Sequence, residues 1–581
     1  MPASVPALYS VAILCAFIAS AYSAPIETSS PYPASAEHPA PAWFVDVAAK
    51  AGITVRNVNG SETSKRYIVE STGSGVAILD YDRDGWPDIF LVNGSTLPLQ
   101  KVSGDAPTSH LFHNNHDGTF TDVTAKAGIA FTAWGQGACV GDYDNDGYDD
   151  IYVTAYGHNH LLHNQRDGTF RDVSAESGTA GSGSEWGTGC AFIDYNRDGL
   201  LDLVVADYVH FDLATTPAPG AEAGCIWKGT PVMCGPRGLP SAPNILYRNE
   251  GGGHFKDVSA QSGITKTMAH YCFSVTTLDY NEDGWPDIYV ACDSTPSILY
   301  RNNRDGTFTD VGLDTGVAFN EDGREQAGMG STAADYDGDG HLDLFKTNFS
   351  DDTSTLYHAN GDGTFTDVTY EAGLGINSDT LGWGAMFADV DNDGLPDLLV
   401  VNGHVYPEVD AAHLGATFKE PRFLYWNQGN GKFKDLSNSS GPGLTEPMSG
   451  RGLAIADLFN DGRIDAVVNN LSDRPSLLVN EAKNANHWIG IRLVGTNSNR
   501  SAIGARVTVR AANRRWVDEV RSGSSYSSSN DLRLHFGLGT LTAVQGIEVR
   551  WPNGAREQFM ADGVDRILEL VEGKGQQSGT K

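Results

Sequence analysis

The chain has 581 residues, and its 40% content of hydrophobic residues is high enough for a packed core, which argues against global disorder. Its 73 acidic residues outnumber its 40 basic residues, and the net charge of −33 at pH 7 argues against nucleic acid or an anionic membrane surface as a partner. Glycine is abundant, at 67 residues, as expected for a fold with many tight turns.

The N-terminal segment has the composition of a secretory signal peptide. An apolar run over residues 7–21 ends in Ala-Tyr-Ser, the small-x-small pattern of a cleavage site. We therefore predict a signal peptide over 1–23 and an extracellular or periplasmic location. An uncleaved membrane anchor is the alternative, although the run is short for a span. Residues 24–42, rich in Pro, Ala and Ser, are expected to be a linker, and no integral membrane span is expected after cleavage.

A nine-residue acidic motif, D-x-[DN]-x-D-G-x-x-D, recurs six times between Asp80 and Asp397, and a degraded seventh copy runs from Asp457 to Asp465. Oxygens at positions 1, 3, 5 and 9 and the backbone carbonyl at position 7 can surround a hard cation such as Ca²⁺, and the glycine at position 6 permits the sharp turn. The predicted metal ligands, loop by loop, are Asp80, Asp82, Asp84, Trp86 and Asp88; Asp142, Asp144, Asp146, Tyr148 and Asp150; Asp194, Asn196, Asp198, Leu200 and Asp202; Asp279, Asn281, Asp283, Trp285 and Asp287; Asp335, Asp337, Asp339, His341 and Asp343; Asp389, Asp391, Asp393, Leu395 and Asp397; and Asp457, Asp461 and Asp465.

The seven loops are not expected to bind calcium equally. Loops 1, 2, 5 and 6 offer four Asp each, whereas loops 3 and 4 carry Asn196 and Asn281 at position 3. Loop 7 has Phe459 there and loses that ligand, so weak or absent metal is expected. The sequence thus predicts about six calcium sites and a doubtful seventh.

The segments around the loops predict short strands. Apolar runs rich in β-branched and aromatic residues flank each loop, and a second motif ending in Asp-Gly-Thr-Phe-x-Asp-Val predicts a hairpin. Four antiparallel strands repeating along a chain describe the blade of a propeller. The last blade lacks an outer strand, and the spare strand Phe44–Val47 would complete it and close a ring. We predict an all-β fold with a seven-bladed β-propeller over 43–482; a linear solenoid is the alternative.

The cysteines differ in their expected roles. Cys225 and Cys234 bracket a Gly/Pro-rich insertion and are predicted to form a disulfide. Cys272 and Cys292 flank one acidic loop and are candidates for pairing across adjacent strands. Two others, Cys139 and Cys190, are interpreted as small core residues.

Strand parity separates two faces of the ring. The acidic loops and the Asp-Gly turns lie on one face, and long insertions over 93–109, 208–241 and 403–421 lie on the other. Because recognition usually resides in loops on a rigid scaffold, the second face is the predicted ligand face. The candidate contacts are Tyr208, His210, Trp227, Lys228, Arg237, His404 and Glu408.

The last part of the chain predicts a compact β domain over 486–572 and a flexible tail over 573–581. The acidic loops resemble the FG-GAP or VCBS repeats of integrin α-subunit propellers. The segments Asn499–Val507 and Asp531–Gly539 resemble the ASPIC/UnbV domain that follows such repeats in the cartilage acidic protein family. An EF-hand does not fit, because the flanks are strands and no Glu stands at position 12. The resemblance implies a secreted calcium-binding protein with adhesive or interaction roles.

No catalytic residue is predicted. The sequence contains neither G-x-S-x-G nor H-E-x-x-H, and the group of His158, His160 and His163 favours packing over a transition-metal site. We therefore expect a module that recognises an extracellular protein or glycan, with structural calcium. A calcium-dependent carbohydrate-active enzyme, a polysaccharide lyase or hydrolase, is the alternative.

Overall fold

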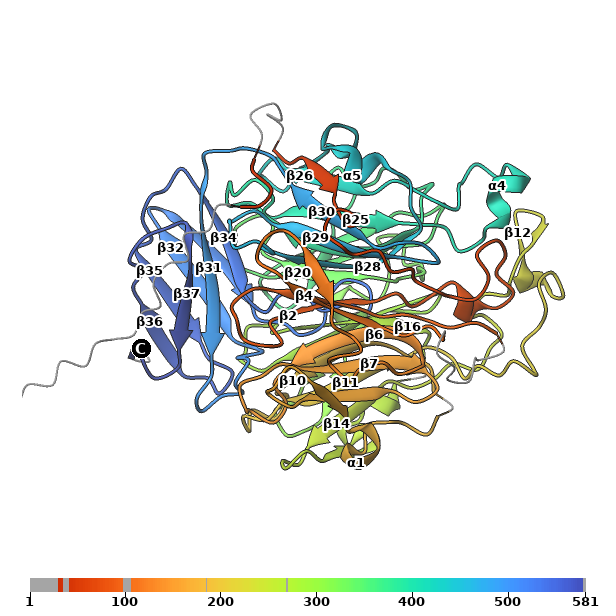
Figure 1. The fold of residues 1–581 in the computed structure, drawn as a ribbon, viewed down its shortest axis with the longest axis horizontal. Helices are drawn as coiled ribbons and strands as arrows, with labels where there is room; N and C mark the ends of the chain where they lie inside the picture. Colours follow the sequence, from red (N-terminus) through yellow and green to blue (C-terminus); the bar gives the residue numbers. More distant parts are fainter. Residues whose placement is uncertain (1–29, 35–40, 98–105, 184, 268–269, 578–581) are drawn as a thin grey trace, which may run out of the picture.

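The computed structural model describes residues 30–34, 41–97, 106–183, 185–267 and 270–577. Within these residues the dominant elements are short antiparallel strands, and seven of the sheets have four strands each. The predicted signal peptide over 1–23 lies outside the described residues. Figure 1 shows two parts, a large body formed by the four-stranded sheets and a smaller β domain packed against one side of it.

The seven sheets are the blades of the propeller, and six of them are continuous in the chain. Blades 1 and 2 consist of β2 (Val76–Leu79), β3 (Asp88–Leu91), β4 (His110–Asn114), β5 (Phe120–Asp122), β6 (Trp134–Gly141), β7 (Asp150–Tyr156), β8 (His160–Asn164) and β9 (Phe170–Asp172). Blades 3 and 4 consist of β10 (Gly187–Ile193), β11 (Asp202–Asp207), β14 (Ile245–Asn249), β15 (Phe255–Asp257), β16 (Cys272–Leu278), β17 (Asp287–Cys292), β18 (Ile298–Asn302) and β19 (Phe308–Asp310). Blades 5 and 6 consist of β20 (Ser331–Ala334), β21 (Asp343–Lys346), β22 (Thr355–Ala359), β23 (Phe365–Asp367), β24 (Gly382–Ala388), β25 (Asp397–Asn402), β26 (Phe423–Asn427) and β27 (Phe433–Asp435).

The seventh blade joins the two ends of the propeller. It combines β28 (Gly450–Ala456), β29 (Asp465–Asn470) and β30 (Ser476–Asn480) with β1 (Phe44–Asp46). The strand β1 runs antiparallel to β30, with Phe44 opposite Asn480. The innermost strands contact one another in the cyclic order β2, β6, β10, β16, β20, β24, β28 and back to β2. The predicted closure by the N-terminal strand is therefore confirmed, and a linear solenoid is excluded.

Both faces of each blade are buried, which explains the continuous apolar runs in the sequence. Ala77 and Phe90 of blade 1, for example, share a core with Val140 and Ile151 of blade 2. Close approach of the innermost strands requires glycine, because a Cβ on Gly137 would lie 2.6 Å from the carbonyl oxygen of Thr188 in the next blade.

Short elements decorate the connections. The α-helices are α1 (Ser174–Ser177), α2 (Ser259–Ser262), α3 (Gly312–Thr315), α4 (Glu408–Ala412) and α5 (Pro442–Thr445). The 3₁₀ helices are η1 (Ile68–Glu70), η2 (Ala223–Cys225), η3 (Ile264–Lys266) and η4 (Ser437–Ser439), and a small hairpin is formed by β12 (Ile226–Trp227) and β13 (Thr230–Pro231). Among the described residues, no helix is long and apolar enough to cross a membrane.

The described residues contain three disulfides. The predicted Cys225–Cys234 bond closes the insertion of blade 3, and Cys272–Cys292 joins opposed residues of β16 and β17. The interpretation of Cys139 and Cys190 as unpaired core residues is wrong. They lie on β6 and β10, the innermost strands of blades 2 and 3, whose close contact leaves their Cα atoms 5.8 Å apart, within bonding range.

The C-terminal domain is a sandwich of two sheets. One sheet has the order β34-β31-β37, from β31 (His487–Val494), β34 (Leu534–Gly539) and β37 (Arg566–Val571). The other has the order β33-β32-β35-β36-β38, from β32 (Arg506–Ala511), β33 (Arg514–Glu519), β35 (Gly546–Arg550), β36 (Arg556–Phe559) and β38 (Gln576–Gln577). Its apolar core is continuous with that of blades 2 and 3, because Ile489, Val507 and Trp551 belong to the same cluster as Tyr152 and Phe192.

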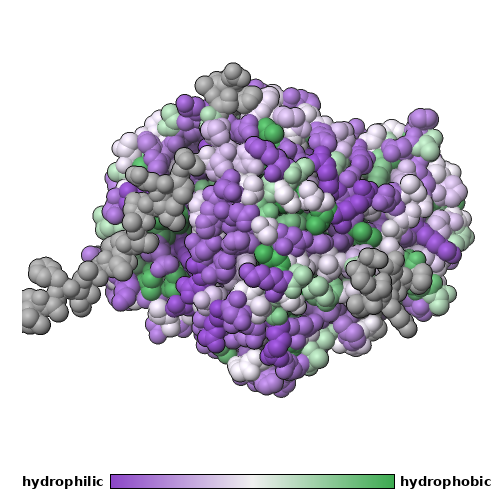
Figure 2. Space-filling model, in the orientation of Figure 1, coloured by the Kyte–Doolittle hydropathy of each residue, from purple (hydrophilic) through white to green (hydrophobic). Residues whose placement is uncertain are grey.

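Two predicted boundaries change. The segment predicted as a linker contributes Tyr32, which is 3% exposed, packs its ring against Phe459 and donates a hydrogen bond to the carbonyl of Gly118. The segment predicted as a flexible tail contributes β38, which pairs with β36 and extends the domain to Gln577. The first segment is thus packed against the propeller, and the second adds an edge strand to the sheet of the C-terminal domain. Figure 2 shows that the surface in this view is mainly hydrophilic, with apolar residues scattered over it.

Candidate metal centres

The acidic loops are organised by their own carboxylates. In loop 1 the Asp80 side chain accepts hydrogen bonds from the backbone N–H groups of Asp84 (3.0 Å) and Gly85 (3.1 Å), and Asp84 accepts one from Trp86 (2.9 Å). Arg83 and Gly85 have φ of +60° and +89°, so the chain turns through two left-handed residues. This turn brings the side chains of positions 1, 3 and 9 together.

Ligand atoms of these positions converge as a cation would require. In loop 1 one oxygen each of Asp80, Asp82 and Asp88 lie within 4.8 Å of one another. The corresponding residues of loop 2, at positions 1, 3 and 9, do the same. Oxygen ligands 2.3–2.6 Å from Ca²⁺ fit this spacing. The backbone carbonyl at position 7 and the number of ions stay predictions.

In loops 3, 4 and 7, position 9 carries an oxygen that the protein leaves without a hydrogen bond. Asp202 and Asp287 are fully buried, and the Oδ1 of each accepts the backbone N–H of an Asn in the third strand of its blade. Their Oδ2 atoms have no hydrogen-bond partner. A buried carboxylate oxygen in that state is costly, and a cation would satisfy it.

The electrostatics of the loops lead to the same conclusion. Burial, reinforced by the neighbouring Asp150, raises the pKa of Asp142 to about 8. Burial and then Asp198 raise the pKa of Asp194 to about 7. Carboxylates held this close raise one another's pKa values, because each negative charge disfavours the next. A bound divalent cation would lower these pKa values again. The residues present therefore fit Ca²⁺.

Loop 7 differs as the sequence suggested. Phe459, at position 3, is fully buried with its ring 5.2 Å from that of Tyr32. The guanidinium of Arg463 neutralises a carboxylate that would otherwise bind a metal ion, because Arg463 Nη2 lies 2.6 Å from Asp461 Oδ2. These two contacts are the physical reason to expect weak or absent metal in loop 7.

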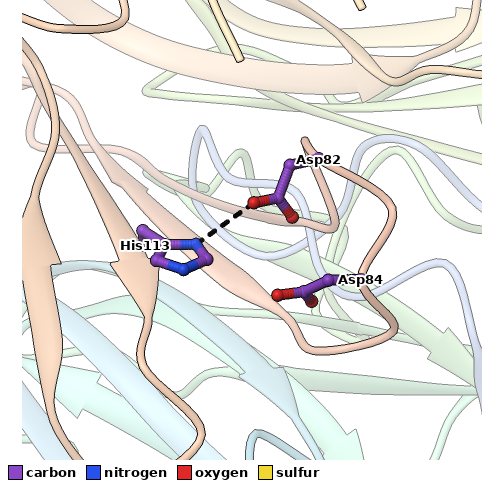
Figure 3. A group of neighbouring side chains, drawn as sticks. All are labelled: Asp82, Asp84 and His113. Atoms are coloured by element: carbon purple, nitrogen blue, oxygen red, sulfur yellow. Dashed lines mark ion pairs between the residues drawn. The ribbon is translucent and has the colours of Figure 1, made fainter. Parts of the chain in front are cut away.

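A histidine lies over three of the loops, and sequence reasoning missed this role. In Figure 3 the ring of His113 points toward Asp82 and Asp84, with Nδ1 3.4 Å from Asp82 Oδ2. His163 in blade 2 and His358 in blade 5 occupy the same position of the third strand. The signal can be found only by aligning the blades. In blade 1, Ile89 directly follows the nine-residue motif and pairs with Phe112, and His113 is the next residue after Phe112.

The nearby histidines do not form one site. His160 pairs with Asp172 at 2.7 Å and stacks on Phe131, whereas His163 faces Asp150 at 3.1 Å. The interpretation of the His158, His160 and His163 group as packing residues is consistent with the stacking of His160 on Phe131 and with the ring of His163, which lies 5.7 Å from that of Tyr143.

The C-terminal domain covers the acidic loops. Residues at position 4 of the loops, which project from the left-handed turn, make many of the contacts. Asn145 accepts a hydrogen bond from the backbone of Arg500, Arg197 donates to the carbonyl of Pro552, and Glu282 pairs with Arg506. Further contacts of the same kind are Asn392–His535 and Asn460–Arg533.

A serine-rich segment of the domain enters the centre of the ring. We call residues 522–529 the finger; all of them are buried. Its backbone pairs with the innermost strands through Ser525–Ser331 and Ser529–Ala77 bridges. At its tip, Tyr526 is fully buried, with its ring 4.7 Å from that of Trp383 and 5.6 Å from that of Phe273.

The opposite face carries the insertions, and in Figure 1 β12 and α4 project from the side of the propeller away from the C-terminal domain. Lys228 is exposed, lies over the half-buried ring of Trp227 and pairs with Asp351 at 2.9 Å. His210 and Arg237 are exposed as well. These residues form the insertion face.

Two candidate contacts do not lie on the surface. Tyr208 and His404 are fully buried, and Tyr208 donates a hydrogen bond to Asp293 (2.6 Å). Burial lowers the pKa of His404 to about 3, so its ring is neutral, and it lies 4.8 Å from the ring of Trp227. Both support the insertions from beneath. Glu408, the first residue of α4, is half-buried.

Comparisons with known proteins agree with this architecture. A model of the FG-GAP-like repeat matches residues 80–153, 142–205, 238–290, 279–346, 335–400 and 414–468, together more than half of the chain, and a model described as ASPIC and UnbV matches 495–577. Cartilage acidic protein 1 of Mus musculus is 24% identical over 520 residues, which cover 86% of this chain and 73% of that protein. The human protein of that name is 23% identical over 522 residues, covering 86% and 72%.

Among solved structures, a lectin of Agrocybe aegerita, described as recognising non-reducing terminal N-acetylglucosamine, has a TM-score of 0.36 and 18% identity, covering 69% of this chain and 87% of its own. A likeness of this degree carries no argument about function.

Proposed function

Because the chain belongs to the FG-GAP repeat family and ends in an ASPIC and UnbV domain, we propose that it is a secreted, calcium-loaded propeller that recognises an extracellular protein or glycan through its insertion face. The observation that carries the proposal is that the C-terminal domain contacts the acidic loops of several blades and occupies part of that side. The insertions lie on the other side, away from this domain, and are open to a ligand.

The chemistry of the insertion face suits recognition. Trp227 offers a half-exposed aromatic ring beside the cation of Lys228, a pair that contacts both sugar rings and acidic groups. The Cys225–Cys234 bond and the buried His404 hold this ring in place before a ligand arrives. Less ordering entropy is then lost on binding.

Calcium and secretion belong to the same proposal. Extracellular modules bind Ca²⁺ with a Kd of about 10⁻⁴–10⁻³ M, so about six loops would be loaded outside the cell and the seventh empty or weak. Three disulfides are typical of an oxidising compartment and support secretion or a periplasmic location.

The test uses the full mature chain in millimolar calcium on arrays of glycans and of purified matrix proteins. Trp227→Ala and Lys228→Ala should each weaken binding of the retained ligand by at least about tenfold. Lys434→Ala, a change of an exposed lysine on β27, should leave it unchanged. Equal binding by all variants would contradict an insertion-face site. Release of cleaved saccharide would instead support the lyase or hydrolase alternative.

A further inference from the structure

Three acidic loops bring a nitrogen atom into the cluster of carboxylates. In blade 1, one ligand atom each of Asp82, Asp84 and His113 lie within 4.8 Å of one another (Figure 3). His113 Nδ1 also lies 3.3 Å from Oδ1 of the fully buried Asp88. The ring nitrogen therefore faces the space that the loop oxygens surround.

The same arrangement recurs in two further blades. Asp144, Asp146 and His163 of blade 2 meet the same distance limit, as do Asp337, Asp339 and His358 of blade 5. His358 Nδ1 lies 3.3 Å from Asp337 and 3.2 Å from Asp343. Blade 5 is not adjacent to blades 1 and 2, so the three sites have different neighbouring residues. The recurrence therefore reflects the position of the histidine relative to the loop and not one local environment.

A second observation points to a ligand. In blade 5, Asp335 is 6% exposed, and its Oδ1 and the Nδ1 of His358 have no hydrogen-bond partner. In blade 1, Oδ1 of Asp82 and Nδ1 of His113 are in the same state. Buried oxygen atoms without hydrogen bonds thus lie in two of the three sites, where the Nδ1 atoms contact carboxylates only at ion-pair distance. A cation that accepts both kinds of ligand would satisfy them together.

The other blades supply internal controls. The position of His113 is occupied by Arg248 and Arg301 in blades 3 and 4, where the loop has Asn at position 3. In blade 6 it is Trp426, whose Nε1 donates to Asp391 Oδ2 at 3.1 Å. In blade 7 it is Val479, over a loop that has Phe459. Among the blades described, an imidazole therefore occupies this position only in blades 1, 2 and 5, whose loops have a full set of Asp.

We propose that the loops of blades 1, 2 and 5 bind a first-row transition-metal ion, with His113, His163 and His358 as nitrogen ligands, while the other competent loops bind Ca²⁺. Imidazole suits first-row transition-metal ions such as Zn²⁺, whereas Ca²⁺ takes oxygen ligands. The inference rests on the proposed metal-binding role of the acidic loops, and it adds the identity of the ion at three of them.

The experiment uses the full mature chain, loaded with calcium and titrated with Co²⁺, whose visible absorption reports nitrogen coordination. The wild type should take up to three Co²⁺ ions and release a matching share of its Ca²⁺, measured by elemental analysis. The triple variant His113→Gln, His163→Gln and His358→Gln should keep its Ca²⁺ and bind Co²⁺ at least about 100-fold more weakly.

Each single variant should lose one Co²⁺ ion, which keeps the test valid if the triple variant is unstable. Arg301→Gln, at the same register in blade 4, should lose none, and melting in excess calcium checks that all variants fold. Unchanged Co²⁺ uptake by the His variants would overturn the inference. Tighter Ca²⁺ binding as their only change would overturn it too, because the protonated rings would then act as positive charges that compete with the metal ion. If neither Ca²⁺ nor Co²⁺ binds the wild type, it is the proposed calcium role that fails.

Discussion

The two sides of the propeller are held in different ways. On the acidic-loop side, the C-terminal domain joins several blades into one body; Arg550, for example, lies 2.6 Å from Asp279 Oδ2, and Trp516 Nε1 donates to the carbonyl of Gly394 at 2.9 Å. On the insertion face, the Cys225–Cys234 bond lies within one insertion, and the contacts that reach other blades include the exposed Lys228–Asp351 pair.

We therefore expect the acidic-loop side to determine stability and the insertion face to determine recognition. Contacts that span blades and involve buried charges couple the metal loops, the finger and the ring, so a change there should propagate through the whole body. Contacts within one insertion can change without cost to the ring. The insertion face is therefore the side on which sequence can vary to suit a ligand.

Of the changes that test this difference between the two sides, metal removal should have the largest effect on stability. At a free metal-ion concentration of ten times Kd, each bound ion contributes about 1.4 kcal/mol, so six ions of whichever metal contribute roughly 8 kcal/mol. Chelation should lower the melting temperature by on the order of 10 °C. Thermal unfolding with and without chelator measures it, and elemental analysis of the same samples shows whether metal was removed. An unchanged melting curve after demonstrated removal would contradict a stabilising role.

The finger provides the next largest effect. Tyr526→Ala removes a fully buried ring from between Trp383 and Phe273 and should cost about 3–5 kcal/mol, the range for large aromatic truncations. The C-terminal domain should become more susceptible to limited proteolysis. Tyr370→Ala is the matched control, since Tyr370 is 62% exposed and its loss should change melting little. Equal melting of the two variants would mean that the finger does not hold the domain.

Much of the propeller was predictable because its signals are local and repeated. The spacing of the acidic motif places a strand on each side of every loop. The missing outer strand of the last blade predicted that the N-terminal strand completes it, as β1 does by pairing with β30. The Cys225–Cys234 bond was predictable for the same reason, since both cysteines lie in one short insertion.

The features that sequence reasoning missed depend on contacts between distant segments. Cys139 and Cys190 become neighbours only when two innermost strands meet across blades. The finger has a Gly/Ser composition typical of an exposed loop, and nothing near Tyr526 in the sequence indicates burial in the ring. His113 and His163 stand in the same repeated strand motif, but the sequence does not show that their rings face the acidic loops.

A single loop should have a smaller effect than the finger. Asp202→Asn in loop 3 removes a charge whose Oδ2 has no hydrogen-bond partner, so one bound Ca²⁺ should be lost, together with about 1–2 kcal/mol of stability in calcium. Asp465→Asn is the matched change in loop 7, where Oδ2 is also without a partner but position 3 is Phe459. Its calcium content should not change. Loss of one ion from both variants would show that loop 7 binds metal despite Phe459.

The insertion disulfide should have the smallest effect on the whole molecule. In the chain-entropy model, closing the short loop between Cys225 and Cys234 contributes about 2–3 kcal/mol. This free energy stabilises the folded conformation of the insertion and not the ring. The double variant Cys225→Ser and Cys234→Ser should therefore melt close to the wild type and be cleaved faster by protease within 208–241. The pair Cys139→Ser and Cys190→Ser is the control from the ring itself, and it should lower the melting temperature because that bond links two blades. If the insertion variant melts as early as the ring variant, the insertion face is coupled to the propeller core, and the separation of stability from recognition does not hold.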